Sequence, residues 1–146
     1  MKYSLRQATY GDRPFAELLH EQCYREVVIR QFGGWDPAVQ QQFFDRKWQP
    51  DQYRVIVLDG AAVGLLAVHQ QSDQLYLSDI QIHPSRQNQG IGSAILTDLL
   101  EQARTLGVPL RLQVLQANRA RAFYEKLGLV CYGQTDTHLF FEQRCT

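Results

Sequence analysis

The 146-residue chain lacks several features that would point to a membrane or to nucleic acid. No stretch approaches about 18 consecutive apolar residues, so we expect no transmembrane helix. The segment Met1–Arg6 has no apolar core, so we expect no signal peptide. Acidic and basic residues balance to a net charge of zero, and the basic residues form no run. We therefore expect no surface devoted to nucleic acid.

Cysteine is also scarce, with Cys23, Cys131 and Cys145 as the whole set. An odd, widely spaced set without a Cys-x-x-Cys motif is not typical of a disulfide framework. A reducing, cytoplasmic location is the expectation that follows. The sequence contains no internal repeat, no low-complexity stretch and no pattern typical of a metal site. Its length suits one domain over residues 1–146.

A glycine-bearing loop is the most informative feature that is present. It follows an apolar run at 75–82 and precedes a helical pattern at 95–105, and it comprises Gln87, Asn88, Gln89, Gly90, Ile91, Gly92 and Ser93. A loop of this kind presents backbone N–H groups at a helix N-terminus, where the helix dipole favours negative charge. Glycine lets the backbone approach a bound anion closely. The pattern predicts a phosphate-binding turn, with an ordinary tight turn as the alternative.

Two common classes of glycine loop fit poorly. A P-loop ends in Gly-Lys-Ser/Thr, and a dinucleotide fold needs three spaced glycines and a later acidic residue; the chain has neither. Gln87, Gly90 and Gly92 instead fill the pattern Gln/Arg-x-x-Gly-x-Gly/Ala. This resembles the pyrophosphate-binding motif of the GNAT superfamily, the acyl-CoA-dependent N-acetyltransferases. The segment Asn118–Leu129 resembles a second GNAT segment, in the expected order; the likeness covers about residues 53–142 and is weak to absent in the first fifty.

The sequence predicts a layout that fits the GNAT order. We expect an edge strand at 2–8, helices at about 12–31 and 36–46, strands at 53–59, 61–70 and 75–83, a helix at 90–106, a strand at 110–115, a helix at 118–127 and strands at 129–132 and 138–143. The fold class is α/β (α+β). It has a mixed, mostly antiparallel central sheet, splayed at the cofactor-binding strand and flanked by helices.

The resemblance implies acetyl-CoA as co-substrate and assigns its contacts. The pantetheine arm would lie along the backbone of Ile80, Gln81 and Ile82, and the pyrophosphate would lie in the 87–93 loop. The backbone N–H of Ile80 would stabilise the oxyanion. Asn118 would contact the pantetheine arm, or would be only a helix N-cap. No metal takes part.

Two side chains are assigned to catalysis. Tyr124 would protonate the departing thiolate, because a phenol titrates near ~10 and a thiol near ~8.5; its alternative is packing beside Phe123. Asp79 is the sole carboxylate on the strand at 75–83 and is the candidate base, directly or through water, unless it anchors a cationic acceptor or is structural. Gln113 stands where ribosomal-protein N-terminal acetyltransferases place a glutamate, and it has no titratable proton.

The resulting hypothesis is an N-acetyltransferase that moves an acetyl group from acetyl-CoA to a primary amine by direct attack in a ternary complex. The alternative is a non-catalytic acyl-CoA sensor of the same fold. The acceptor could be a small molecule, a peptide N-terminus or a lysine. We expect a monomer or a homodimer, without nucleic acid or membrane as partner. The roles of Trp35 and His138 stay open between pocket wall and packing.

Overall fold

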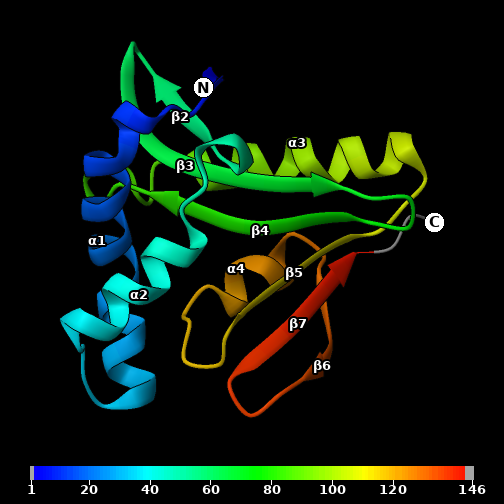
Figure 1. Ribbon diagram of the computed structural model, residues 1–146. Helices are drawn as coiled ribbons and strands as arrows, with labels where there is room; N and C mark the ends of the chain where they lie inside the picture. Colours follow the sequence, from blue (N-terminus) through cyan, green and yellow to red (C-terminus); the bar gives the residue numbers. More distant parts are fainter. Residues whose placement is uncertain (1, 144–146) are drawn as a thin grey trace. The chain divides into compact units, whose positions relative to one another are not determined.

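The computed structural model of the protein describes residues 2–143 (Figure 1). The chain groups into two compact units. The first comprises the residues up to Ala67 together with Asp79–Ile91, and the second comprises Val68–Ser78 together with the residues from Gly92 onward. Strands β3 (Ala61–Gln70) and β4 (Leu75–Ile82) each contribute residues to both units. The single domain expected over 1–146 stays a prediction.

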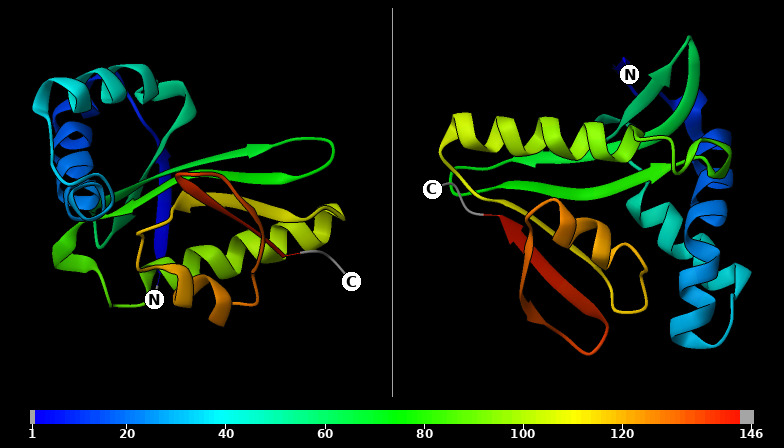
Figure 2. Two further views of the ribbon diagram at one scale, coloured as in Figure 1. Left: turned by 90° about the horizontal axis from the view of Figure 1, so that it is seen from below. Right: turned by 180° about the vertical axis from the view of Figure 1, so that it is seen from behind.

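Two helices of the first unit begin and end at local signals in the sequence. Helix α1 spans Arg13–Phe32 and ends at Gly33, which has φ 86° and donates its N–H to the carbonyl of Ile29 at 2.8 Å. Helix α2 spans Pro37–Lys47, and the Asp36 side chain accepts from two N–H groups of its first turn. Glycine ends and Asx caps are the usual solutions for unpaired helix termini. The two helices lie side by side in every view (Figures 1 and 2).

The strands of the first unit form an antiparallel arrangement. β1 (Tyr3–Gln7) pairs with β2 (Arg54–Leu58), and β2 pairs with β3. Asp59 and Gly60 join β2 to β3 with φ angles of 52° and 78°. Positive φ at both central residues fits the twist of a two-residue hairpin, as the Asp-Gly pair predicted.

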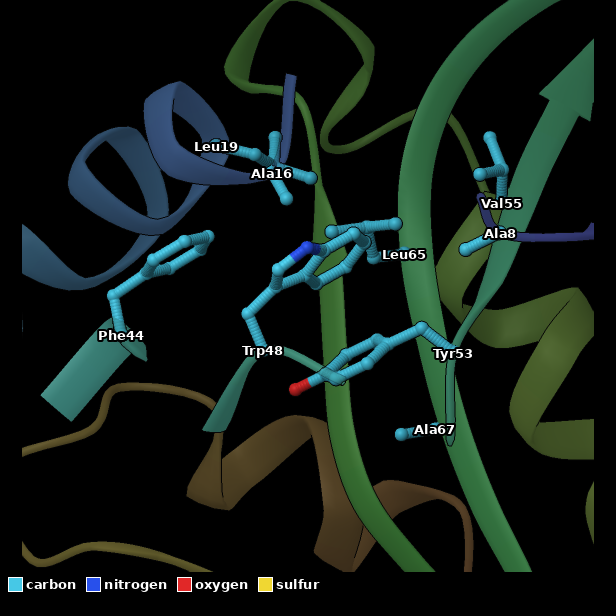
Figure 3. Close-up of a cluster of buried hydrophobic side chains, with 9 residues drawn as sticks. All are labelled: Ala8, Ala16, Leu19, Phe44, Trp48, Tyr53, Val55, Leu65 and Ala67. Carbon is cyan, nitrogen blue, oxygen red and sulfur yellow. The ribbon is translucent and has the colours of Figure 1, made fainter. Parts of the chain in front are cut away.

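Aromatic residues fill much of the first unit's core (Figure 3). The Phe44 and Trp48 rings stack with centroids 6.1 Å apart, and Trp48 lies 5.3 Å from Tyr53. Leu19 and Leu65 pack in the same cluster, each 1% exposed. This packing fixes Tyr53, whose hydroxyl lies at the site described below.

The strands of the second unit are paired by β5 and β7. β5 (Leu110–Leu115) pairs with β7 (His138–Gln143), and β7 pairs with β6 (Val130–Gln134), both antiparallel. β4 runs parallel to β5, with pairs from Leu75↔Leu110 to Leu77↔Leu112. The hydrogen-bonding order is β1-β2-β3-β4-β5-β7-β6. The mixed, mostly antiparallel sheet is confirmed, and the splay of β4 stays a prediction.

The remaining helices follow the prediction with one correction. Helix α3 spans Ile91–Leu106, as expected. Helix α4 spans Arg121–Lys126 and not 118–127. The Asn118 side chain accepts from the N–H of Ala120 at 2.8 Å, which stabilises a turn before the helix. Asn118 is therefore not the helix N-cap. Short 3-10 turns lie at Tyr10–Asp12, Pro50–Gln52 and Pro84–Arg86.

Within residues 2–143, no helix combines the length and the apolar character needed to cross a membrane. The same part of the chain holds no group of three or more His, Cys, Asp and Glu side chains suited to a metal ion. Cys23 and Cys131 are thiols, and Cys145 lies outside the described residues.

Candidate active site

The Asp79 carboxylate is the centre of a buried polar cluster in the first unit. Tyr24, on α1, donates its hydroxyl to Oδ1. Oδ2 accepts from the Tyr53 hydroxyl at 2.7 Å and from Gln81 Nε2 at 2.7 Å. The Lys47 ammonium, from the end of α2, lies 3.3 Å from Oδ2. Donors from α1, α2, β4 and the segment before β2 therefore converge on one carboxylate.

Asp79 is ionised although its side chain is only 5% exposed. Burial alone raises the pKa of this carboxyl, but the charge of Lys47 and three hydrogen bonds outweigh burial and hold the pKa below its ordinary value. Burial and the charge of Asp79 raise the pKa of Tyr24 and of Tyr53. At neutral pH the cluster therefore contains a carboxylate, an ammonium and two neutral phenols. A carboxylate with a depressed pKa is a weak proton acceptor.

Lys47 is held on its other side by α1. Its ammonium donates to His20 Nδ1 at 2.9 Å and lies 4.5 Å from the centroid of the Tyr24 ring. His20 Nε2 lies 3.0 Å from Gln40 Oε1, an atom that only accepts, so Nε2 carries the hydrogen and the ring is neutral. Burial, and then the charge of Lys47, hold the pKa of His20 below its ordinary value. Trp35 packs on His20 with centroids 5.7 Å apart.

The end of β4 places its peptide groups in a definite direction. A Cβ atom on Gly64 of β3 would lie 2.2 Å from the carbonyl oxygen of Gln81, so this oxygen faces β3. Successive residues of a strand direct their peptide groups to opposite edges. Ile80 and Ile82 therefore direct theirs to the opposite edge of the strand.

The carbonyl of Ile82 is already used by two side chains. It accepts from Cys23 Sγ at 3.3 Å and from Gln87 Nε2 at 2.9 Å. These bonds tie α1 and the first residue of the glycine loop to the same strand end.

The glycine loop lies between β4 and α3, as predicted. Asn88 and Gly90 have φ angles of 62° and 89°, and residues 87–90 are exposed. Gln89 Nε2 donates to the carbonyl of Ser85 at 3.2 Å, so its side chain, like that of Gln87, bonds the chain itself. A Cβ atom on Gly92 would meet Phe123 at an ordinary 3.7 Å. The Phe123 ring therefore leaves room for a Cβ atom at position 92.

Tyr124 lies in the second unit, on α4. It is 6% exposed, and its ring lies 5.4 Å from that of Phe123 and 5.8 Å from that of Phe141. The expected packing with Phe123 is confirmed. Such packing fixes the ring and is compatible with a catalytic hydroxyl, so the acid role stays a prediction.

Gln113 and His138, which the sequence singled out, have structural contacts. Burial raises the pKa of the Tyr76 phenol, and its hydrogen bond with Gln113 lowers this pKa by a smaller amount. His138 Nδ1 lies 2.7 Å from the Thr137 hydroxyl. The backbone N–H of His138 donates to Thr135 Oγ1. Both groups belong to the second unit.

Sequence reasoning found Asp79 but missed most of its partners. Lys47, Tyr53 and His20 come from different segments, and no local pattern relates them to β4. Tyr24 reaches the carboxylate from α1. A buried carboxylate needs paired donors, and here they come from residues that lie far apart along the chain.

Comparisons with known proteins place this geometry in context. The sequence matches the acetyltransferase (GNAT) family over residues 16–129. PaiA N-acetyltransferase from Thermoplasma acidophilum, solved in complex with coenzyme A, is 14% identical with a TM-score of 0.78 and 99% of each chain covered. Ribosomal-protein-S18-alanine N-acetyltransferase from Escherichia coli is 21% identical with a TM-score of 0.64, covering 97% of this chain and 92% of that one.

A larger relative has the same fold in part of its length. N-acetylglutamate synthase from Neisseria gonorrhoeae, complexed with coenzyme A and N-acetyl-glutamate, is 16% identical with a TM-score of 0.65. The match covers 100% of this chain and 36% of the synthase. Likenesses at these identities establish the fold.

Proposed function

Because the chain belongs to the acetyltransferase (GNAT) family, we propose that it transfers the acetyl group of acetyl-CoA to a primary amine by direct attack in a ternary complex. One observation carries the proposal: a loop with positive φ at Asn88 and Gly90 leads from β4 into α3, and the Gln87 side chain ties this loop to the carbonyl of Ile82. Two relatives of the same fold were solved with coenzyme A, which supports acetyl-CoA as the co-substrate.

The 87–93 loop would hold the pyrophosphate. Backbone N–H groups at the start of a 16-residue helix suit an anion, and Gly90 and Gly92 place no side chain in its way. Gln87 would act indirectly, because its side chain ties the loop to Ile82. The peptide group of Ile80 would serve the thioester end of the arm, and Asn118 would contact the arm further along.

The chemical step needs an oxyanion donor and an acid. The Ile80 N–H would stabilise the charge that develops on the thioester oxygen, an effect worth a factor of roughly 10² to 10³ where such donors have been removed. As the C–S bond breaks, Tyr124 would give its proton to the thiolate. The proton lost by the attacking nitrogen would then restore the phenol, so the products are the amide and the free thiol.

The part played by Asp79 is electrostatic in this proposal. Its carboxylate orients Tyr24 and Tyr53 and fixes Lys47 beside the strand that would carry the thioester. Action as a base, directly or through water, is the competing role. A depressed pKa and four engaged donors make Asp79 a weak candidate for that role.

A non-catalytic acyl-CoA sensor is the second candidate function. It needs the loop and the strand end but no acid at the sulfur. The experiment that separates the two functions is a screen of primary amines with acetyl-CoA, in which the released thiol and the mass of the product are measured. An enzyme releases thiol with at least one amine and forms its acetyl derivative; a sensor is stabilised by acetyl-CoA and releases none.

Tyr124→Phe extends the same test. We expect the variant to fold, to bind coenzyme A and to lose kcat far more than KM, because the hydroxyl acts on charge that exists only near the transition state. Tyr10→Phe is the matched control, since Tyr10 is 87% exposed. A wild-type kcat in Tyr124→Phe at neutral pH would remove Tyr124 as the acid.

A further inference from the structure

Lys47 neutralises the carboxylate that the sequence offered as base or as cation anchor. Its ammonium lies 3.3 Å from Asp79 Oδ2, with side-chain exposures of 27% and 5%. His20 Nδ1 and the Tyr24 ring hold the same ammonium from α1. The pair is therefore built into the fold and is not a surface ion pair whose geometry is loose.

Within the described part of the first unit, the groups that contact this pair add no further charge. Facing it are the neutral His20, Tyr24 and the Cys23 thiol from α1, Tyr53 from the segment before β2, and Gln81 from β4. Burial raises the pKa of Cys23 to about 11, so the thiol stays protonated. Glu21 acts on His20 but is exposed and paired with Arg25. The buried cluster thus has a net charge of zero at neutral pH.

We infer that Lys47 determines the class of acceptor: because it cancels the charge of Asp79, the site selects an amine that is already neutral, an α-amino group, over lysine side chains and polyamines. The inference rests on the proposed function, with the acceptor nitrogen approaching the thioester beside Asp79. An incoming ammonium would gain no net attraction from the neutral pair and would be repelled by Lys47 at short range. A neutral amine avoids both effects, and the cluster offers no strong base that would deprotonate an ammonium after binding.

The proton affinity of the acceptor then sets the preference. At pH 7 a lysine amine with a pKa of ~10.4 is neutral in roughly 1 molecule in 2,500, whereas an α-amine at ~7.7 to 8.0 is neutral in roughly 1 in 6 to 1 in 11. The neutral fraction of the α-amine therefore exceeds that of the lysine amine a few hundredfold at pH 7, on proton affinity alone. A site that supplied a base or an unpaired carboxylate would reduce the resulting preference for the α-amine.

The wild-type protein tests the inference with matched acceptors. One peptide has a free N-terminal alanine and no lysine; the second has the same sequence with a blocked N-terminus and one lysine. Alaninamide and Nα-blocked lysine amide form a small-molecule pair, and a linear polyamine completes the set. We expect kcat/KM at pH 7 to favour the α-amine by roughly tenfold or more, and the ratio to shrink as the pH approaches the lysine pKa of ~10.4.

Variants of Lys47 give a readout that a merely structural role would not produce. Lys47→Met leaves Asp79 unpaired, so KM for lysine and polyamine acceptors should fall and the α-amine preference at pH 7 should narrow by roughly tenfold. Lys47→Arg should keep the preference because it keeps the charge. Arg104→Met removes a cation from an exposed pair with Glu101 and should change nothing. Circular dichroism establishes that each variant is folded, and the wild-type comparison stands even if Lys47→Met does not fold.

Two results would overturn the inference. One is a wild-type preference for lysine or polyamine at pH 7; the other is an unchanged acceptor ratio in folded Lys47→Met. Either leaves the acetyltransferase function intact, because thiol is still released. Failure of the proposed function has a different signature, which is coenzyme A binding without thiol release for every amine.

Discussion

At the scale of single residues, Asp79 shows what a buried charge requires. Two phenols, one amide and one ammonium saturate it, and each donor comes from a segment that the fold must bring close. Removing one partner of a buried ion pair leaves the other uncompensated, which commonly costs more than removing both. The cluster therefore couples the position of α2 to the ionisation of a residue on β4.

We predict that Asp79→Asn lowers the stability by roughly 3 kcal/mol, because Lys47 loses its partner. The double variant Asp79→Asn/Lys47→Met should be less destabilised than the sum of the two single variants, with a coupling of about 0.5–3 kcal/mol. Urea denaturation of the four proteins measures this cycle. Additive effects would show that the pair contributes no energy of its own.

The same Asp79→Asn variant tests the role of the carboxylate in catalysis. We expect the shape of its pH–rate profile to match that of the wild type, because the proposal gives the carboxylate an electrostatic role and its lowered pKa makes it a weaker proton acceptor. A rate lower by roughly 10² to 10⁴ at neutral pH, recovering as the pH rises toward the pKa of the amine, would instead identify Asp79 as the base.

At the scale of elements, the segment from β4 through the loop to α3 combines two local features. The loop turns with positive φ at Asn88 and Gly90, and the Gln87 side chain returns to bond the carbonyl of Ile82. In the proposed function, backbone N–H groups at the start of the long helix α3 would then bind the pyrophosphate.

Acetyl-CoA should raise the thermal stability of the wild type, by about 2.7 kcal/mol at a ligand concentration of 100 Kd. We predict that Gly90→Asp abolishes this increase, because it adds a side chain and a negative charge where the pyrophosphate would lie. Gly34→Asp is the control, since no atom lies within 4 Å of a Cβ atom at that glycine. Thermal shift with and without acetyl-CoA measures the increase within each variant, so basal strain does not enter. An undiminished shift in Gly90→Asp would contradict the phosphate-loop interpretation.

Substitution of Gly64 on β3 tests how closely the backbones of β3 and β4 approach each other at this position. A Cβ atom there would lie 2.2 Å from a backbone oxygen, so Gly64→Ala must displace Gln81 and should cost about 1–3 kcal/mol. Gly34→Ala should leave the stability unchanged or slightly raised. Chemical denaturation of both variants gives the comparison, and equal stabilities would mean that β3 and β4 adjust without cost.

At the scale of the whole molecule, the titration of buried groups links folding to pH. His20 is neutral in the folded protein and has a pKa below its ordinary value. The unfolded chain takes up this proton near pH ~6.5 while the folded chain does not, so stability falls as the pH drops below that value. Asp79 and Asp12 act at lower pH. Their folded pKa values lie below the ordinary 3.8, with Asp12 at about 2 because Arg6 bonds it, so their stabilisation is lost as the pH falls below that value.

We predict that the free energy of unfolding decreases between pH 6.5 and the lower folded pKa of His20, by less than about 1.4 kcal/mol per pH unit. His20→Gln should flatten this part of the curve. His69→Gln replaces a histidine that pairs with Ser78 and should not alter it. Guanidinium denaturation from pH 8 to pH 5 provides the data; a slope that His20→Gln leaves intact would assign the pH dependence to another group.

The sequence by itself determined the local structure, including the strand–loop–helix order to which the proposal assigns the cofactor. Caps at Asp36 and Gly33, the Asp59-Gly60 hairpin and the strand–loop–helix order depend on neighbouring residues, so their signals are readable in the chain. Helix α4 was predicted three residues too early, because the turn made by the Asn118 side chain competes with helix at its start.

Only the tertiary structure decided what surrounds Asp79. Lys47, His20, Tyr24 and Tyr53 reach it from segments without a shared local pattern, and the resemblance to known motifs did not extend to Lys47, His20 or Tyr24. The charge state of a buried carboxylate depends on the donors placed around it, which the sequence does not order in space. The fold therefore places the residue that the sequence offered as a base, or as an anchor for a cationic acceptor, 3.3 Å from the Lys47 ammonium.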